Sequence, residues 1–302
     1  MLHRYVNWIL FFAVGIFWGA TIPLIKIVVI KEAHPLTLVF WGTVIGLVLI
    51  FGWMIWRRIS LPLSAAYIRL YIIIAILGTL VPNSFSYWAA PHLTASEMAI
   101  IYSLVPILIF ALATAVKQEA FVFRRMVGVL IGLAAMLVLI LPEAGKVSGN
   151  LFWMLVIFGA CLGYAGESVF IAAKMPEDVH PIAVMCGMFL AALALIAPVM
   201  IWQGASFTFF ETGSAPEIAL FISAIFHFFC YTGMLVLIRR TGAVFTSQLT
   251  YVITLAGVFL GILFLGDLLS VWTWAALAIA MVGIYLVQPV KEEDTQKRTE
   301  AS

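Results

Sequence analysis

The second half of this 302-residue chain repeats the residue pattern of its first half, and this internal repeat restricts the possible folds more than any other feature. The segment from Pro106 to Glu119 recurs as the segment from Thr254 to Asp267, with the same spacing of 13 residues. The dipeptide His34-Pro35 recurs 146 positions later. Such self-similarity indicates two copies of one folding unit that pack against each other.

The composition indicates that the protein folds in a lipid bilayer. The chain is 65% hydrophobic and 10% charged, with a mean hydropathy of +1.15. A soluble domain needs about 25% charged residues to cover its surface. The net charge of +2 indicates no nucleic-acid partner. The three cysteines lack metal-ligand spacing, so no metal site and no cofactor are expected.

Apolar runs occur ten times, each long enough to cross a hydrocarbon layer of about 30 Å as a helix. The runs lie near residues 7–29, 35–56, 67–90, 94–116, 122–141, 150–174, 181–202, 216–238, 244–265 and 270–288. Because five crossings end on the side opposite their start, the second unit must be inverted relative to the first. The expected fold is therefore an all-α membrane protein with ten transmembrane helices in two inverted five-helix repeats.

The distribution of Lys and Arg predicts the orientation. With the amino terminus in the cytoplasm, 13 of the 16 Lys and Arg residues fall on the cytoplasmic side. Lys31 and Lys146 fall outside, and Lys26 lies within the first span. This bias predicts that both termini are cytoplasmic. The expected units are a first repeat at 1–145, a second repeat at 146–290 and a disordered polar cytoplasmic tail at 291–302.

Short motifs follow one another along the chain in a characteristic order. They are Phe17-Trp18-Gly19 in the first span, Pro106 and Glu119 in and after the fourth, Gly128 to Gly132 in the fifth, and Asp267 after the ninth. In order, spacing and duplication they resemble the EamA-type members of the drug/metabolite transporter (DMT) superfamily over residues 7–288. The resemblance implies a multi-pass transporter of a bacterial-type inner membrane. Two positions depart from the family pattern, because Thr254 replaces a proline and Glu97 replaces a small apolar residue.

Polar and aromatic side chains lie at mid-depth on several predicted helices, and spacings of three or four residues place them on one face. A charge at the bilayer centre costs about 2.5–3.5 kcal/mol, so such groups face the bundle interior or a wet cavity. We therefore predict a substrate cavity near the pseudo-two-fold axis. The alternative is that the aromatic rings belong to the core or to interfacial belts. The predicted lining residues are Trp18, Thr21, Thr79, Asn83, Tyr87, Tyr102, Tyr164, His227, Tyr231 and Tyr251.

Two sets of charged residues lie within the predicted spans. Glu167 in the sixth span is either a proton carrier that couples transport or a hydrogen-bonded brace. Lys26 and Glu97 fall at the same predicted height near the outer interface. We predict an ion pair between them that acts as an outer gate. The alternative is a static brace or two side chains that reach water separately.

The leading functional interpretation is a secondary active transporter that works by alternating access and exports a small metabolite, such as an amino acid or a related compound. Import of a vitamin or heteroaromatic cofactor and multidrug efflux are alternatives. A channel is disfavoured, since aromatic groups at mid-depth suit an occludable site. A membrane-embedded enzyme is disfavoured by the absence of His-Glu-x-x-His and Gly-x-Ser-x-Gly motifs. The expected partners are the substrate and the bilayer, with the chain a monomer or homodimer.

Overall fold

The structure is a computed structural model that describes residues 2–119, 121–144, 150–176, 179–211, 213–241, 246 and 249–287. Within these residues the chain is helical apart from short connections and contains no strand. The helices are α1 (Leu2–Val29), α2 (Pro35–Arg57), α3 (Ala65–Ala75), η1 (Ile76–Leu80), α4 (Val81–Ala89), α5 (Ala95–Tyr102), α6 (Val105–Ala115), α7 (Phe123–Ala144), α8 (Asn150–Lys174), α9 (Pro181–Gln203), α10 (Ala215–Thr241), α12 (Leu249–Leu265) and α13 (Val271–Val287).

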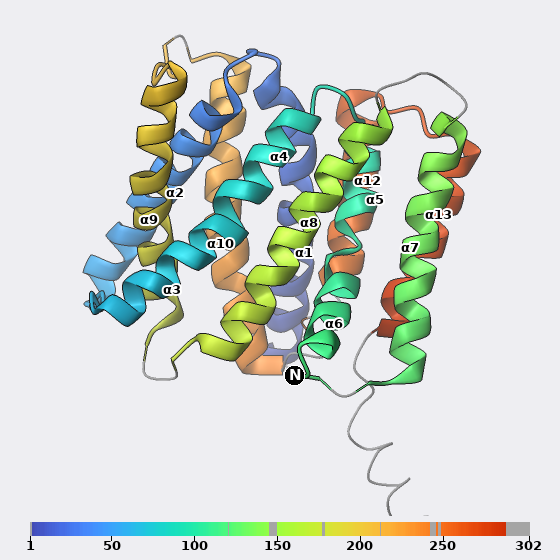
Figure 1. The fold of residues 1–302 in the computed structure, drawn as a ribbon, viewed down its shortest axis with the longest axis horizontal. Coiled ribbons are helices and arrows are strands. Elements are labelled where there is room, and N and C mark those ends of the chain that lie inside the picture. Colours follow the sequence, from blue (N-terminus) through green and yellow to red (C-terminus); the bar gives the residue numbers. More distant parts are fainter. Residues whose placement is uncertain are drawn as a thin grey trace, which may run out of the picture.

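The described residues confirm the prediction of ten spans (Figure 1). The third span consists of α3, η1 and α4, the fourth of α5 and α6, and each of the others is a single helix. By length and composition, seven described segments are suited to cross a membrane, and α12 and α13 are shorter apolar helices. The expected tail at 291–302, the repeat boundary near 145 and Lys146 lie outside the described residues.

Proline explains why the third and fourth spans are interrupted. Its ring nitrogen has no hydrogen to donate, and the ring crowds the preceding helical turn. Before Pro82 the chain forms the π-helical segment η1, after which the Val81 N–H donates to the Ile76 carbonyl. In the fourth span α5 ends and α6 begins just before Pro106. Single π-helical turns are frequent at functional sites, and this one borders the cavity described below.

Equivalent helices of the two repeats run through the bundle in opposite directions. Helix α2 and its counterpart α9 begin at opposite faces (Figure 1), yet both begin with a His-Pro cap. The His34 Nδ1 accepts the Leu36 N–H at 3.3 Å, and the His180 Nδ1 accepts the Ile182 N–H at 3.2 Å. The same local sequence therefore starts the same helix from either side, as inverted repeats require.

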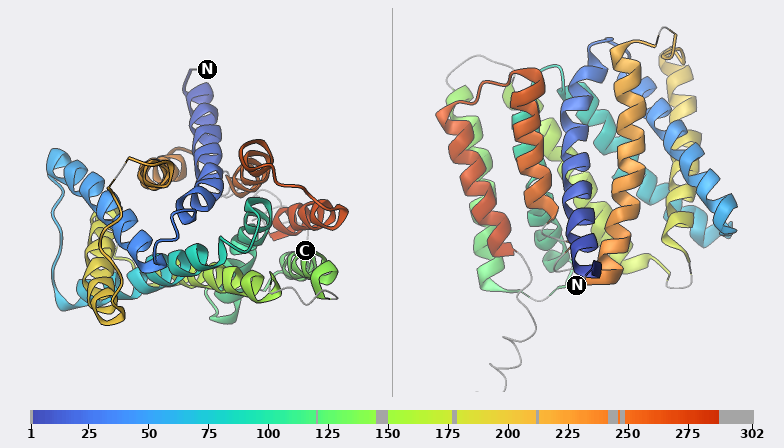
Figure 2. Two further views of the ribbon diagram at one scale, coloured as in Figure 1. Left: turned by 90° about the horizontal axis from the view of Figure 1, so that it is seen from above. Right: turned by 180° about the vertical axis from the view of Figure 1, so that it is seen from behind.

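The two repeats exchange helices across their interface. Helix α1 of the first repeat packs against α10 and α12 of the second, and its counterpart α8 packs against η1, α4, α5 and α6 of the first. Helices α7 and α13 pair at one end of the bundle, and α2, α3 and α9 lie at the other (Figure 2). The α7–α13 pair is close because glycines meet there: a Cβ on Gly283 would lie 3.0 Å from the Gly132 nitrogen.

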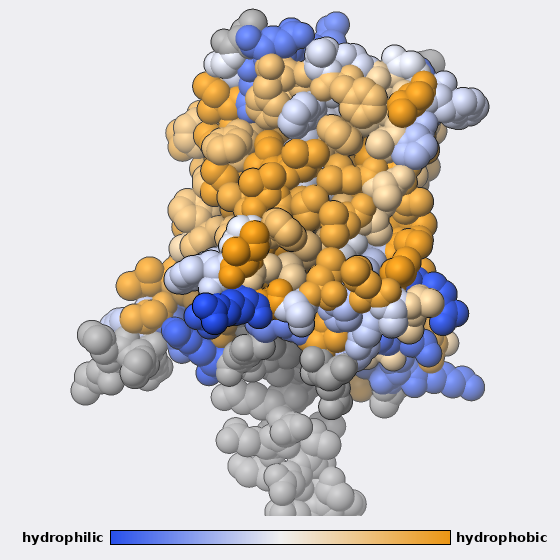
Figure 3. Space-filling model, turned by 90° about the vertical axis from the view of Figure 1, so that its left-hand side faces the viewer, coloured by the Kyte–Doolittle hydropathy of each residue, from blue (hydrophilic) through white to orange (hydrophobic). Residues whose placement is uncertain are grey.

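The molecular surface has the layering of a membrane protein. Figure 3 shows an apolar band between two polar edges on the side formed by α2, α3 and α9. Large apolar side chains such as Trp56, Trp202 and Leu263 are well exposed in this fold. We call the face where α1 begins the proximal face and the opposite face the distal face. Helix α13 also ends at the proximal face (Figure 2), which agrees with an even number of spans. The charge bias predicts that the proximal face is cytoplasmic.

Candidate functional site

A cavity of about 580 Å³ lies in the described part of the bundle, between the two repeats. Its lining comes from α1, α2, η1, α4, α5, α6, α8, α9, α10 and α12, together with Thr246. Two hydrophobic clusters flank it, one built on α5, α7, α8 and α13 and the other on α2, α3 and α9. The cavity therefore occupies the position expected for a substrate site between inverted repeats.

The structure brings most of the predicted site residues to this cavity. Those that line it are Trp18, Thr21, Thr79, Asn83, Tyr87, Tyr102, Tyr164, Glu167, His227 and Tyr231. Tyr251 lies outside the lining, because its side chain packs against the cluster built on α5, α7, α8 and α13. Its hydroxyl is buried and has no hydrogen-bond partner among the described residues.

One wall of the cavity is a chain of hydroxyl and amide groups on α4, α5 and α8. The Tyr164 hydroxyl donates to Asn83 Oδ1 at 3.2 Å, which leaves the Asn83 amide hydrogens for a ligand. The Ser86 hydroxyl donates to the Pro82 carbonyl at 2.6 Å. Ser86 also hydrogen-bonds Tyr102, so the Tyr102 hydroxyl must be the donor in that contact. The hydroxyl hydrogens of Tyr102 and Tyr164 are thus used within the protein, and this wall offers the Asn83 amide and tyrosine ring faces to a ligand.

The opposite wall comes from α1, α10 and α12. The rings of Trp18 and His227 meet edge to face, with 6.4 Å between centroids. The Thr21 hydroxyl donates to the Trp18 carbonyl at 2.6 Å, and the Thr254 hydroxyl donates to the Thr250 carbonyl at 2.9 Å. These hydroxyls donate to carbonyls of their own helices. The wall therefore combines aromatic surface with hydroxyl oxygens that can still accept a hydrogen bond from a ligand.

Sequence reasoning missed several lining residues. Ser86 lies one turn beyond Asn83 on the same helix face, and that spacing could have identified it. The small and apolar residues of α2 and α9, such as Gly42, Gly46 and Met188, carry no chemical signal of a cavity. They line it because of how the helices are rotated, which a single sequence does not report.

Glu167 projects from α8 toward η1 and borders the cavity. A Cβ on Gly78 would overlap its carboxyl group, so the absence of a side chain in η1 makes room for the acid. Within the described residues, no hydrogen bond or ion pair engages this carboxyl group. Tyr164 and Tyr231 are its neighbours within electrostatic range. Sequence reasoning identified the acid but not the glycine that accommodates it.

Lys26 and Glu97 both lie near the distal face, outside the cavity lining. The Lys26 ammonium donates to the carbonyls of Ala90 and Leu93, the second at 2.5 Å. The Glu97 carboxylate accepts the Thr94 N–H at 2.8 Å and so caps α5. The structure thus gives each of the two charges a local structural partner.

Asp267 also contributes to this distal group. Its carboxylate accepts the Ser96 N–H at 2.9 Å and the Ser96 hydroxyl at 2.8 Å. Asp267 and Glu97 both lie within electrostatic range of the Lys26 ammonium. Sequence reasoning placed Glu97 beside Lys26, and it named Asp267 as a motif residue without placing it in this group.

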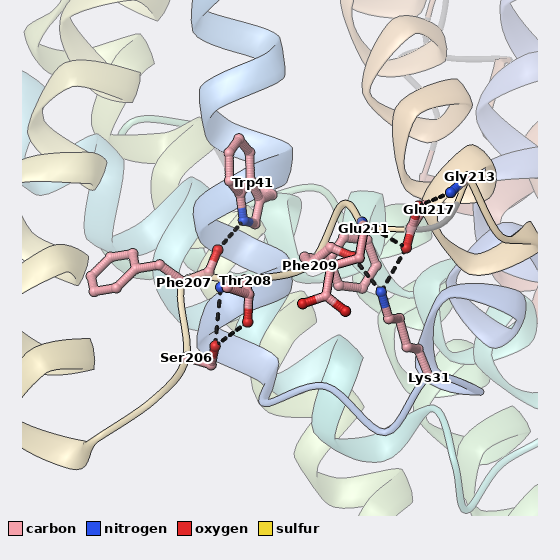
Figure 4. A network of polar contacts seen from close by, with 9 residues as sticks. All are labelled: Lys31, Trp41, Ser206, Phe207, Thr208, Phe209, Glu211, Gly213 and Glu217. Carbon is pink, nitrogen blue, oxygen red and sulfur yellow. Dashed lines mark hydrogen bonds and ion pairs between the residues drawn. The ribbon is translucent and has the colours of Figure 1, made fainter.

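A second distal group joins the α1–α2 connection to the α9–α10 connection (Figure 4). The Lys31 Nζ lies 2.6 Å from Glu217 Oε1, donates to the Phe209 carbonyl and lies 4.9 Å from the centroid of the Phe209 ring. Glu217 also accepts the backbone N–H groups of Glu211 at 3.2 Å and Gly213 at 2.6 Å. We call Lys31, Phe209 and Glu217 with these contacts the distal network.

Further contacts from α2 hold the same connection in place. The Thr37 hydroxyl donates to the Ser206 carbonyl at 2.6 Å, and the Trp41 Nε1–H donates to the Phe207 carbonyl at 2.8 Å. Phe209 is 1% exposed and belongs to one hydrophobic cluster with the cavity-lining residues Leu38 and Leu220. Phe209 therefore links the distal network to side chains that line the cavity.

The comparisons with known proteins agree with this architecture. Chains of solved structures match in 28 cases. One, described only as "Crystal structure of protein", has a TM-score of 0.62 and 17% identity, and the match covers 94% of this chain and 97% of that chain. This likeness shows the fold. No curated protein matches the chain. The family model described as "EamA-like transporter family" matches residues 7–141 and 151–288, one match in each five-helix repeat. The chain therefore belongs to the EamA-like transporter family, a family of DMT-type membrane transporters.

Proposed function

We propose that the protein is a secondary active transporter that exports a small metabolite, an amino acid or a related compound, through the central cavity. The observation that carries the proposal is the cavity itself, which both inverted repeats line with polar and aromatic side chains. A site shared by two repeats changes its exposure when one repeat rocks against the other.

The distal network supports an alternating-access mechanism. Together with the Thr37 and Trp41 contacts, it joins the α1–α2 connection and α2 of the first repeat to α10 and the α9–α10 connection of the second. Rocking of the repeats would have to break these contacts to open the cavity toward the distal face. In this proposal the distal network is an outer gate, with Lys26, Glu97 and Asp267 as a second group that moves with α1.

Glu167 is the proposed coupling residue. A carboxyl group that borders the cavity without a partner in the described residues can exchange a proton as the cavity changes sides. Replacement by Gln removes that exchange and leaves the shape of the side chain. We expect Glu167→Gln to lose accumulation driven by a proton gradient and to retain exchange of substrate down its own gradient.

The proposal is tested with purified protein in proteoliposomes. Vesicles are screened against a metabolite panel, and internal solute is identified chemically as well as counted. We expect an unmodified solute to accumulate, with a loss of at least about tenfold in Trp18→Ala and Asn83→Ala, which remove cavity contacts of about 1.4 kcal/mol or more. Leu137→Ala on α7, a side chain that is 60% exposed, is the matched control and should transport normally. Covalent change of the solute would indicate an enzyme, and flux that ignores the cavity variants would contradict the proposed site.

A further inference from the structure

The charge of the cavity wall restricts what the cavity can hold. Among the described lining residues, Glu167 is the one acidic side chain, and neither a lysine nor an arginine is present. The Lys26 ammonium is turned away to the Ala90 and Leu93 carbonyls, and the Lys31 ammonium is held by Glu217. When Glu167 is ionised, its charge is therefore not offset by a lysine or arginine of the described lining, in which His227 is the basic side chain.

The Glu167 carboxyl group occupies a space that the backbone of η1 leaves open. Gly78 in η1 leaves the space for the acid, and the interruption of the helix before Pro82 places that glycine opposite α8. An ionised group removed from water is costly unless a countercharge or hydrogen bonds compensate. Because the described side chains supply neither, the natural countercharge is one that arrives with the ligand.

The remaining surface suits an organic cation. Rings of Trp18, Tyr87, Tyr102, Tyr164 and Tyr231 line the cavity. The hydroxyl hydrogens of Tyr102 and Tyr164 are donated to Ser86 and Asn83, which fixes these two rings. Aromatic faces attract an ammonium group within about 6 Å of the ring centroid. Met185, Met188 and Met234 also line the cavity and can accommodate an apolar substituent.

We propose that the substrate is a small organic monocation, an amine or ammonium compound whose charge pairs with Glu167 and whose apolar part lies among the tyrosines and methionines. This proposal rests on the proposed transport function, and among the amino acids and related compounds named there it favours an amine over an amino acid. A zwitterion would place its carboxylate in a cavity whose described lining offers it the Asn83 amide but no Lys or Arg countercharge. An organic dianion would add two charges of the sign that Glu167 already carries.

The test compares solutes that share one phenethyl core and differ in charge. Phenethylamine is the cation, phenylalanine the zwitterion, phenylethanol the neutral analogue and phenylpropionate the anion, with phenyltrimethylammonium as a second cation. The thermal stability of the purified full-length protein is measured against each, since stabilisation increases with ligand concentration over Kd. We expect the two cations to stabilise the wild-type protein most. In Glu167→Gln the apparent affinity for phenethylamine should fall by at least about tenfold, as for loss of a contact to a charged group, with that for phenylethanol unchanged.

Glu119→Gln is the matched control, because its side chain is exposed and paired with Arg125 away from the cavity. Stabilisation by phenylalanine or phenylpropionate equal to that by phenethylamine would overturn the monocation class. So would the absence of stabilisation by either cation at millimolar concentration, or an unchanged amine affinity in Glu167→Gln. The ranking of solutes on the wild-type protein is decisive even where the variant does not fold.

Transport is measured separately in proteoliposomes with the same solutes. Accumulation of the zwitterion in preference to the amine would overturn the substrate class and leave the transporter function standing. If the amine binds in a way that depends on Glu167 but does not accumulate, the proposed transport function is contradicted. The proposed monocation class of the ligand is then still supported.

Discussion

At the scale of single residues, the contact between Gly78 and Glu167 sets the position of the acidic group in the cavity. The acid is useful at this depth only if its carboxyl group lies beside the cavity, and a glycine in η1 makes that position possible. Gly166, the neighbour of Glu167 on α8, provides a contrast. A Cβ there would lie 3.9 Å from Leu77 side-chain atoms, an ordinary contact.

The comparison predicts opposite outcomes for two substitutions that each add one methyl group. Gly78→Ala should displace the Glu167 carboxyl group and lower the free energy of unfolding by about 1–3 kcal/mol, as overpacking of a buried site does. It should also reduce transport strongly. Gly166→Ala should change neither property. Thermal stability and proteoliposome uptake check both variants, and normal transport in Gly78→Ala would show that the carboxyl position is not important.

At the scale of helices and connections, the distal network contains an ion pair whose two side chains differ in exposure. The Glu217 side chain is 3% exposed and the Lys31 side chain is 26% exposed. Loss of the lysine therefore leaves a buried carboxylate without its countercharge, whereas loss of the acid leaves an ammonium that can reach water. Breaking a buried pair from one side typically costs about 3–5 kcal/mol.

We therefore expect Lys31→Met to open the distal end of the cavity more than Glu217→Gln does. The measurement is the labelling rate of a cysteine at Ala224, a buried cavity-lining position, by an impermeant maleimide added to intact cells. The native cysteines at 161, 186 and 230 are replaced first. Glu32→Gln, at an exposed neighbour of Lys31, is the control. Equal labelling in all variants would show that the ion pair does not control access.

At the scale of the whole molecule, the inverted repeats determine which faces the connections occupy. The α9–α10 connection lies at the distal face and the end of α10 at the proximal face (Figure 1). The cytoplasmic assignment of the proximal face comes from the charge bias alone.

Orientation is tested with single cysteines at two exposed positions in a cysteine-free background. A cysteine at Thr208 should react with impermeant maleimide in intact cells, and one at Arg240 only after permeabilisation. Reaction of Arg240→Cys alone in intact cells would reverse the orientation. Reaction of both would contradict the placement of these residues on opposite faces.

Much of the fold could be predicted from the sequence, because hydropathy, charge bias and a long repeat are properties of the chain that the membrane acts on directly. The ten spans and their inversion follow from them, and mid-depth residues such as Asn83, Tyr164 and Glu167 were expected at the cavity that they line. Local signals were sufficient because each span satisfies its own backbone hydrogen bonds before it packs.

Only the tertiary structure decided which side chains meet. Lys31 pairs with Glu217 across 186 positions, Lys26 binds the Ala90 and Leu93 carbonyls, and Tyr251 faces a hydrophobic cluster instead of the cavity. These outcomes depend on the rotation of each helix about its axis and on the angle at which it crosses its neighbours. Small residues such as Gly283 set both through close contact between helices, and no pattern within one helix contains that information.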